Sequence, residues 1–270
     1  MASPARQTGQ ESPALDRDGV RLAVDGALAT VTLTNPAKRN AQSPALWRAL
    51  AEAGRVLPGS VRVVVLRAEG QSFSAGLDRQ AFTPEGFDGE PSFLELARAG
   101  EAEVDAVIAG YQEAFTWWRR GDLVTVAAVQ GHAIGAGFQL ALACDLRVVA
   151  EDAQFAMRET GLGLVPDLTG THPLVRLVGY ARALEICLTG RYVRAEEAVS
   201  TGLANMAVPA GELDGAVRDL TSALLAAPRD AVIETKALLR GASERDHEAQ
   251  RAAERAAQAR RLRDLAGVGD

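Results

Sequence analysis

The chain has 270 residues, of which 47% are hydrophobic and 24% charged, and its formal net charge is −6. This length and composition are typical of a soluble globular protein with a substantial core, in one large domain or two small ones. The acidic balance argues against nucleic acid as a partner, and no apolar run is long enough to cross a bilayer, so we expect neither a nucleic-acid nor a membrane protein.

The N-terminal residues 1–17 predict a flexible lead-in. They are rich in Pro, Ser, Gln and Gly and lack the apolar stretch of a signal peptide, which favours a cytoplasmic protein. Cys144 and Cys187 lie in apolar surroundings and predict small core residues in a reducing compartment rather than a disulfide. No metal-ligand spacing occurs, so we predict no metal site.

Strands are predicted at four places in the chain. Residues 20–34 alternate in polarity around Asp25-Gly26, which indicates a β-hairpin. Residues 61–70 and 123–131 are apolar and rich in β-branched side chains, typical of strands that are buried on both faces of a sheet. Residues 144–150 predict a further strand.

Helices are predicted between and after these strands. Ser43 and Pro44 are suited to the N-cap and first position of a helix that Pro58-Gly59 ends. Further helices are predicted at 101–122, 182–190, 194–204, 212–227 and 243–267. Strands that alternate with helices predict an α/β domain with a largely parallel sheet, followed by a helical region from Val175 onward.

Two glycine-bearing loops follow the two buried strands. They are QSFSAGLD (71–78) and GHAIGAGF (131–138). Ligands bind beyond the carboxyl ends of parallel strands, and glycine lets the backbone approach a ligand closely. The second loop opens a helix, whose first N–H groups have no intrahelical partner and face outward along the positive end of the helix dipole. Two converging N–H groups would form an oxyanion hole, whereas the alternative is a tightly packed turn without a ligand.

Four motifs in order resemble the crotonase superfamily, also called the enoyl-CoA hydratase/isomerase family. They are SFSAGLD (72–78), GHAIGAGFQLALACD (131–145), DAQFAMRETGLGLVPDLTGTHPL (152–174) and ALEICLTGRYVRAEEAVSTGLANMAVP (183–209). The resemblance covers roughly Val20 to Leu239. It implies an α/β fold with a crotonase-like ββα spiral core at 18–190 and a C-terminal helical trimerisation region at 191–270.

The resemblance also implies an acyl-CoA thioester ligand and a homotrimer or a hexamer made of two trimers. Coenzyme A is part of the substrate, so no separate cofactor is expected. The family's oxyanion donors correspond to the N–H groups of Leu77 and Ala136. The ligand is expected to lie along Gly76, Asp78, Gln80, Gly135, Gly137 and Gln139, with either Arg79 or the pair Lys38 and Arg39 at the CoA phosphates.

Gln139 stands where hydratases of the family usually carry a glutamate. Glutamine cannot take a proton at neutral pH and can only orient a water or the substrate through hydrogen bonds. The second glutamate of the family corresponds to Glu159, our main acid/base candidate. Asp167 stands where most hydratases have glycine; it is either a second acid, as in dienoyl-CoA isomerases, or an ordinary turn residue after Pro166.

These residues favour isomerisation of an enoyl- or dienoyl-CoA. An oxyanion hole would stabilise the dienolate that forms when a carboxylate removes a proton beside the thioester, and the proton would return two carbons away. Two alternatives remain open: hydration of a 2-enoyl-CoA by Glu159 alone, and a protein that binds acyl-CoA without turnover.

Overall fold

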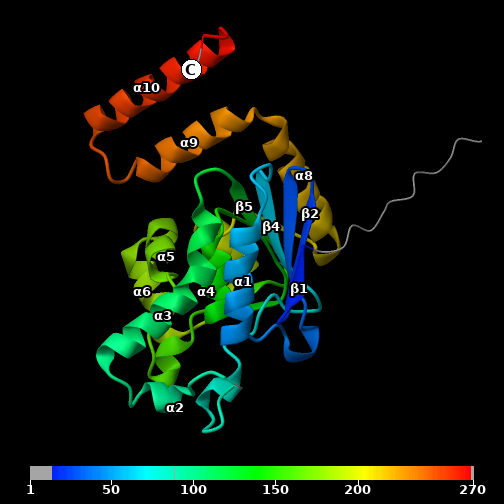
Figure 1. Cartoon of the computed structure of the whole chain (residues 1–270), viewed down its shortest axis with the longest axis vertical. Helices are drawn as coiled ribbons and strands as arrows, with labels where there is room; N and C mark the ends of the chain where they lie inside the picture. The colour runs from blue at the N-terminus through cyan, green and yellow to red at the C-terminus, as the bar shows by residue number, and fades with distance from the viewer. Residues whose placement is uncertain (1–13, 88, 269–270) are drawn as a thin grey trace, which may run out of the picture.

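A seven-stranded sheet forms the centre of the computed structural model, which describes residues 14–87 and 89–268 (Figure 1). Its strand order is β1-β2-β3-β4-β5-β7-β10, and a second, three-stranded sheet has the order β6-β8-β9. In the large sheet β3, β4, β5, β7 and β10 pair in parallel, whereas β1 and β2 join its edge in antiparallel register. The predicted α/β class with a largely parallel sheet is therefore confirmed.

The strands are β1 (Leu15–Arg17), β2 (Val20–Asp25), β3 (Leu28–Leu33), β4 (Val63–Ala68), β5 (Val124–Val129), β6 (His132–Ile134), β7 (Leu146–Ala150), β8 (Gln154–Ala156), β9 (Val193–Arg194) and β10 (Met206–Val208). The α-helices are α1 (Pro44–Val56), α2 (Phe93–Leu96), α3 (Glu101–Thr116), α4 (Ala136–Ala143), α5 (Thr171–Val178), α6 (Tyr180–Thr189), α7 (Ala195–Ser200), α8 (Leu213–Ala226), α9 (Arg229–Gly241) and α10 (His247–Leu265). The 3₁₀ helices are η1 (Pro36–Lys38), η2 (Arg79–Phe82), η3 (Trp117–Arg119), η4 (Glu159–Leu162) and η5 (Ala210–Glu212).

Local sequence signals account for the first elements. The hairpin of β2 and β3 turns through Gly26-Ala27, and Gly26 takes a positive φ of 56°. Helix α1 begins as predicted, because the Ser43 side chain accepts a hydrogen bond from Leu46 N and Pro44 occupies the first turn.

The central strands bury both faces, and their alternate residues enter two separate cores. On β4, Val64 and Leu66 face the larger core, which also contains residues of α1, α3 and α4. Val63 and Val65 face a smaller core, where they meet Val217 of α8. Because both faces of the sheet are covered, a ligand can reach the sheet at the ends of the strands, where the glycine loops lie.

Several predicted boundaries differ from the structure. Residues 15–17 form β1 and pair with β2, so the flexible lead-in does not extend to residue 17; residues 1–13 lie outside the described part of the chain. Helix α5 begins at Thr171, four residues before the predicted start of the helical region. Helix α9 was not predicted. Strand β10, also not predicted, pairs with β7, so the segment after residue 190 is not purely helical.

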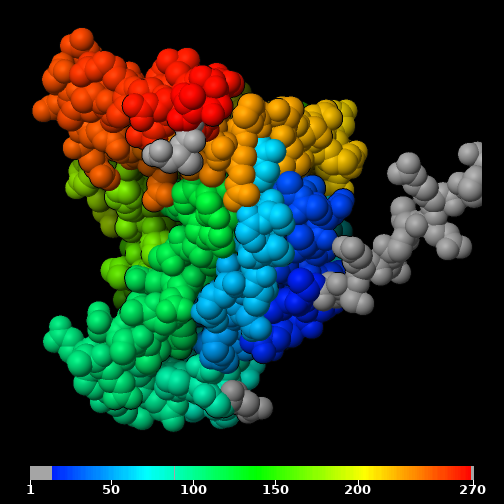
Figure 2. All heavy atoms as spheres, turned by 45° about the horizontal axis from the view of Figure 1, so that its top comes forward, coloured from blue at the N-terminus to red at the C-terminus, as the bar shows by residue number. Residues whose placement is uncertain are grey.

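The last two helices form one end of the molecular surface (Figure 2). Lys236 fixes α9 to the body of the protein, because its Nζ donates to Leu123 O at 2.7 Å and to Asp145 Oδ2 at 2.6 Å. Helix α10 packs on α9 and buries only Ala257 among its residues (Figure 1). Little of this helix is buried against the rest of the chain, and the predicted trimer or hexamer stays a prediction. In the described chain, no helix has the length and apolar character to span a bilayer.

Candidate active site

The two glycine loops meet at the carboxyl end of the sheet. Ser74 N donates to His132 O at 2.8 Å, and Ile134 N donates to Ser74 O at 3.0 Å. A Cβ on Gly76 would lie 2.5 Å from Ile134 O, and a Cβ on Gly137 would lie 2.6 Å from Ser74 O. Glycine is therefore required at both positions because the loops approach each other too closely for any side chain.

This close packing brings two backbone donors together. Leu77 directly follows Gly76, whose ideal Cβ would lie 3.6 Å from Ala136 N. Gly135, at φ 52° and ψ −118°, turns the chain into α4, so Ala136 N–H is the first amide of a helix. Within residues 14–87 and 89–268, neither Leu77 N nor Ala136 N has a hydrogen-bond acceptor. Both N–H groups are therefore available to a ligand, and their convergence on one oxygen stays a prediction.

A buried polar cluster that the sequence did not reveal supports the first loop. Ser74 Oγ donates to Asn40 O at 2.7 Å and accepts from Gly76 N at 3.2 Å and from Gln42 Nε2 at 3.2 Å. The Gln42 amide oxygen in turn accepts from Trp47 Nε1 at 2.8 Å. Asn40, Gln42 and Ser74 are each fully buried. The signal that could have revealed this cluster was the presence of polar residues beside the predicted helix start and in the predicted glycine loop.

Gln139 makes all of its side-chain hydrogen bonds inside the protein. Only 1% of the residue is exposed. Its Nε2 donates to Glu159 Oε1 at 2.7 Å, and its Oε1 accepts from Leu168 N at 2.9 Å and from Gly170 N at 3.2 Å. The structure therefore joins Gln139 to Glu159 and to the segment that follows Asp167. The predicted contact of Gln139 with a ligand stays a prediction.

Glu159 is half-buried, and its two oxygens have different surroundings. Oε1 is held by Gln139, whereas Oε2 is buried and has no hydrogen-bond partner. Burial raises the pKa of this carboxyl, and the nearby Asp167 charge adds to the rise; backbone N–H groups and the Gln139 amide act in the opposite direction. A carboxyl with a raised pKa and one free oxygen suits proton transfer near neutral pH.

Asp167 lies close enough to Glu159 for the two charges to interact. Burial raises the pKa of Asp167 as well, and its own backbone N–H opposes the rise. Its carbonyl oxygen accepts from Gln112 Nε2 of α3 at 2.7 Å. The Asp167 carboxylate makes no hydrogen bond to another residue in the described part of the chain. Both interpretations of this residue, second acid and turn residue, stay open.

The residues predicted to hold the CoA arm mostly bond to one another. Asp78 Oδ2 accepts from Lys38 Nζ at 2.9 Å, and its Oδ1 accepts from Gln80 N at 3.1 Å. Gln80 Nε2 donates to Gly86 O at 2.8 Å. Arg79 and Arg39 are exposed. The roles of these residues in binding CoA phosphates stay predictions.

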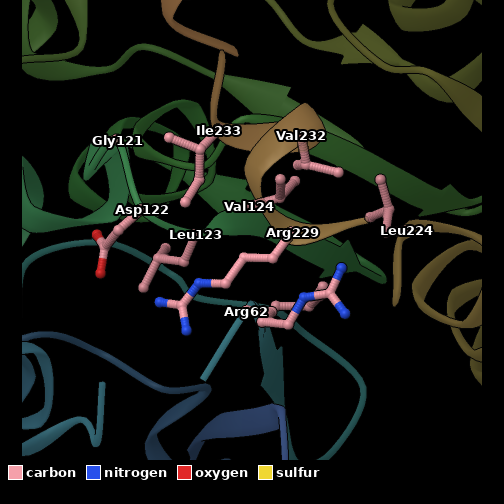
Figure 3. A pocket seen from close by; sticks show the side chains of 10 residues that line it. Arg62, Gly121, Asp122, Leu123, Val124, Leu224, Arg229, Val232 and Ile233 are labelled. Carbon is pink, nitrogen blue, oxygen red and sulfur yellow. The ribbon is translucent and has the colours of Figure 1, made fainter. Parts of the chain in front are cut away.

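The larger of two cavities borders the two glycine loops, since Ser72 and His132 line it. It has a volume of about 940 Å³ and follows the carboxyl ends of β4 and β5, where Arg39, Arg67 and Gln130 line it. The other, of about 10 Å³, has room for about one water and lies between the starts of β4 and β5 and helices α8 and α9, at the opposite end of the strands from the glycine loops (Figure 3). No cluster of three or more metal-ligating side chains occurs among the described residues.

Comparisons with known proteins point to one family. Residues 24–264 match the family model described as enoyl-CoA hydratase/isomerase. The carnitinyl-CoA dehydratase of Salmonella paratyphi A is 34% identical over 230 residues, which cover 84% of this chain and 82% of the relative. The Arabidopsis thaliana protein named "Probable enoyl-CoA hydratase 2, mitochondrial" is 34% identical over 191 residues, which cover 70% of this chain but only 59% of that relative.

Solved structures that resemble this chain also carry enoyl-CoA hydratase names. A protein of Thermobifida fusca YX, assigned as an enoyl-CoA hydratase and solved with acetoacetyl-CoA, is 50% identical, with a TM-score of 0.88 over 91% of this chain and 95% of that one. The same protein solved with CoA gives 49% identity and a TM-score of 0.87, over 92% and 95% of the two chains. This likeness confirms the predicted fold class.

Proposed function

This chain belongs to the enoyl-CoA hydratase/isomerase family, and we propose that it moves a carbon–carbon double bond of an enoyl- or dienoyl-CoA by proton transfer. One observation carries the proposal: the side chain beside Glu159 is the amide of Gln139, so this end of α4 supplies a hydrogen-bond donor and no second carboxylate. In hydratases of the family a second glutamate at that position helps to hold and activate water, whereas proton transfer between carbons needs no held water.

The proposed reaction uses three groups. The thioester oxygen accepts hydrogen bonds from Leu77 N–H and Ala136 N–H, which stabilise the negative charge that develops on it. Glu159 Oε2 removes a proton beside the thioester; the C–H bond breaks, an O–H bond forms, and the electron pair enters the dienolate. Glu159 then returns the proton two carbons away. In the alternative, a protonated Asp167 delivers it, and the proton on Glu159 passes to Asp167 before the next turnover. The step balances without an oxidant, a metal or added water.

An acyl-CoA ligand is supported by the T. fusca protein, whose structures contain CoA and acetoacetyl-CoA. Acetoacetyl-CoA carries a thioester oxygen next to a carbon that readily loses a proton, the same pair of groups that the proposal requires. We propose that CoA enters only as part of the substrate and that no further cofactor takes part.

Product analysis tests the proposal. The protein is incubated with a 2-enoyl-CoA, a 3-enoyl-CoA and a 3,5-dienoyl-CoA, and products are followed by mass and ultraviolet absorbance. We expect conversion of the 3-enoyl- or dienoyl-CoA without a change in mass. Rapid formation of 3-hydroxyacyl-CoA as the main product would instead support a hydratase, and bound but unchanged ligands would support a protein without turnover.

Hydration of a 2-enoyl-CoA is the second candidate, because relatives of this chain carry hydratase and dehydratase names. The substitution Gln139→Glu tests our ranking of isomerisation above hydration. It restores the second carboxylate, so we expect hydratase activity on crotonyl-CoA to increase over that of the unchanged protein. Strong hydratase activity before the substitution, with no gain after it, would reverse our ranking of the two reactions.

Asp167→Asn separates the two interpretations of Asp167. If Asp167 returns the proton, the variant should exchange substrate protons with deuterated water yet form little product, with a loss of roughly 10²–10⁴-fold in kcat. If it is a turn residue, kcat should change little and any loss should follow the melting temperature. Mass spectrometry of recovered substrate and product distinguishes these results.

A further inference from the structure

We propose that Gln139 is a positioning residue that selects the catalytic oxygen of Glu159, by holding Oε1 and leaving Oε2 to take the proton. The inference rests on the proposed function, since it requires Glu159 as the base. It assigns Gln139 a task different from contacting water or substrate.

The amide of Gln139 is suited to this task because its two ends differ. Its oxygen faces two backbone N–H groups, Leu168 N and Gly170 N, which identifies that end as the acceptor. The NH₂ end therefore faces Glu159 Oε1 at 2.7 Å. A carboxylate at this position would place two acceptors in contact, and an apolar side chain would offer neither bond. Glutamine supplies both contacts without taking up a proton, whereas a glutamate here would supply both only when protonated.

The other oxygen of Glu159 is left free in a position that fits a base. Oε2 is buried and lacks a partner, an arrangement that is costly unless the atom serves a function. The carboxylate lies against the start of α4, because a Cβ on Gly135 would be 3.3 Å from Oε1 and 3.8 Å from Oε2. Both carboxylate oxygens are thus near the residue that precedes the Ala136 N–H donor, and the held oxygen Oε1 is the nearer of the two.

Gly170 gives independent support for the role of Gln139. Its backbone, at φ −74° and ψ −24°, is an ordinary conformation that any residue adopts. A Cβ there would nevertheless lie 2.7 Å from Gln139 Cγ and 3.0 Å from its Oε1. Thr169, between the two N–H donors, takes a positive φ of 66°, which is strained for a β-branched residue. The segment after Asp167 is therefore shaped around the Gln139 amide.

The groups that face Glu159 show what removal of the amide should do. Asp167 and the Cys187 thiol of α6 are the titratable groups that interact with its charge. The Arg158 guanidinium instead lies over the Tyr192 ring, 4.9 Å from its centroid. Within the described chain, Gln139 is the one side chain that donates a hydrogen bond to the Glu159 carboxylate. Its loss should destabilise the ionised form of Glu159 and raise the pKa of this carboxyl further.

Two substitutions remove the contact in different ways. Gln139→Met keeps length but offers no hydrogen bond, and Gly170→Ala leaves Gln139 in the chain but displaces its amide. Gly161→Ala is the matched control, because a Cβ there meets nothing within 4 Å. For each variant we would measure the pH profile of kcat/KM on the 3-enoyl-CoA, the Kd of acetoacetyl-CoA and the melting temperature.

We expect both test variants to lose about 10- to 100-fold in kcat, the usual worth of a hydrogen bond to a charged group. The acid limb of kcat/KM should move to higher pH, while the Kd of acetoacetyl-CoA stays within about 2-fold and Gly161→Ala behaves as the unchanged protein. A fall in kcat with an unmoved acid limb, or full activity in both variants, overturns the role of Gln139. If Gln139→Met does not fold, Gly170→Ala decides alone. A fully active Glu159→Gln enzyme would instead reject the proposed function itself.

Discussion

Replacing Glu159 with glutamine should reduce kcat by roughly 10²–10⁴-fold, the usual contribution of a general acid–base group. Glutamine keeps the shape of the side chain and can still accept the hydrogen bond from Gln139 Nε2, but its amide cannot take a proton. Binding should survive because the two backbone donors are unchanged. Steady-state kinetics and the Kd of acetoacetyl-CoA, measured on the same preparation, give the two quantities.

The same substitution should leave the protein at least as stable at neutral pH. Burial raises the pKa of Glu159 in the folded state, so the folded protein binds this proton more tightly than the unfolded chain does. Ionisation of Glu159 therefore opposes folding at any pH above the raised pKa, and glutamine removes that cost. A melting temperature equal to or above that of the unchanged protein, together with lost turnover, is the expected combination. A large fall in melting temperature would mean that the lost activity reports misfolding.

Replacing Ala136 with proline should remove most of the turnover, because it deletes one of the two proposed oxyanion donors. Loss of one such donor typically costs about 3 kcal/mol, or about 10²–10³-fold in kcat. The helix itself should tolerate the change, since proline is favoured at the first position of a helix. Gly135, at φ 52° and ψ −118°, has the mirror image of the extended conformation that residues before proline prefer, which glycine can adopt.

Ala136→Gly is the control for this variant, because glycine keeps the N–H group. It should retain most of the activity and lose only a little stability. Circular dichroism and the melting temperature establish that both variants fold. A folded Ala136→Pro enzyme with full activity would remove Ala136 from the site, even if Glu159→Gln were inactive.

Local signals in the sequence predicted the strands, the loops and the helix start that surround this site. Ser43-Pro44 begins α1, and the two buried strands lead into glycine loops that the structure brings into contact. Gly76 shows the reason. It lies where the two loops approach closely and has a positive φ of 87°, and the sequence indicates both by a glycine in a loop after a buried strand. Such features depend on residues that are neighbours in the chain.

The parts that were missed depend on contacts between distant residues. Gln139 bonds to Glu159 and to Leu168, 20 and 29 positions away, which no local pattern indicates. Strand β10 has three half-buried residues, and only its pairing with β7 makes it part of the sheet. Lys38 pairs with Asp78, 40 positions away, a contact that no local pattern indicates, and its role at a ligand phosphate stays a prediction.

The most direct test of proton transfer is the product formed from one 3-enoyl-CoA in deuterated water, with the unchanged protein and Glu159→Gln side by side. The proposed mechanism predicts that the unchanged protein forms the conjugated 2-enoyl-CoA, seen as increased ultraviolet absorbance of the thioester, and adds no water. It predicts little product with Glu159→Gln. An unchanged protein that leaves the 3-enoyl-CoA untouched yet adds water to a 2-enoyl-CoA, or a Glu159→Gln variant that forms the conjugated product at the normal rate, would contradict it.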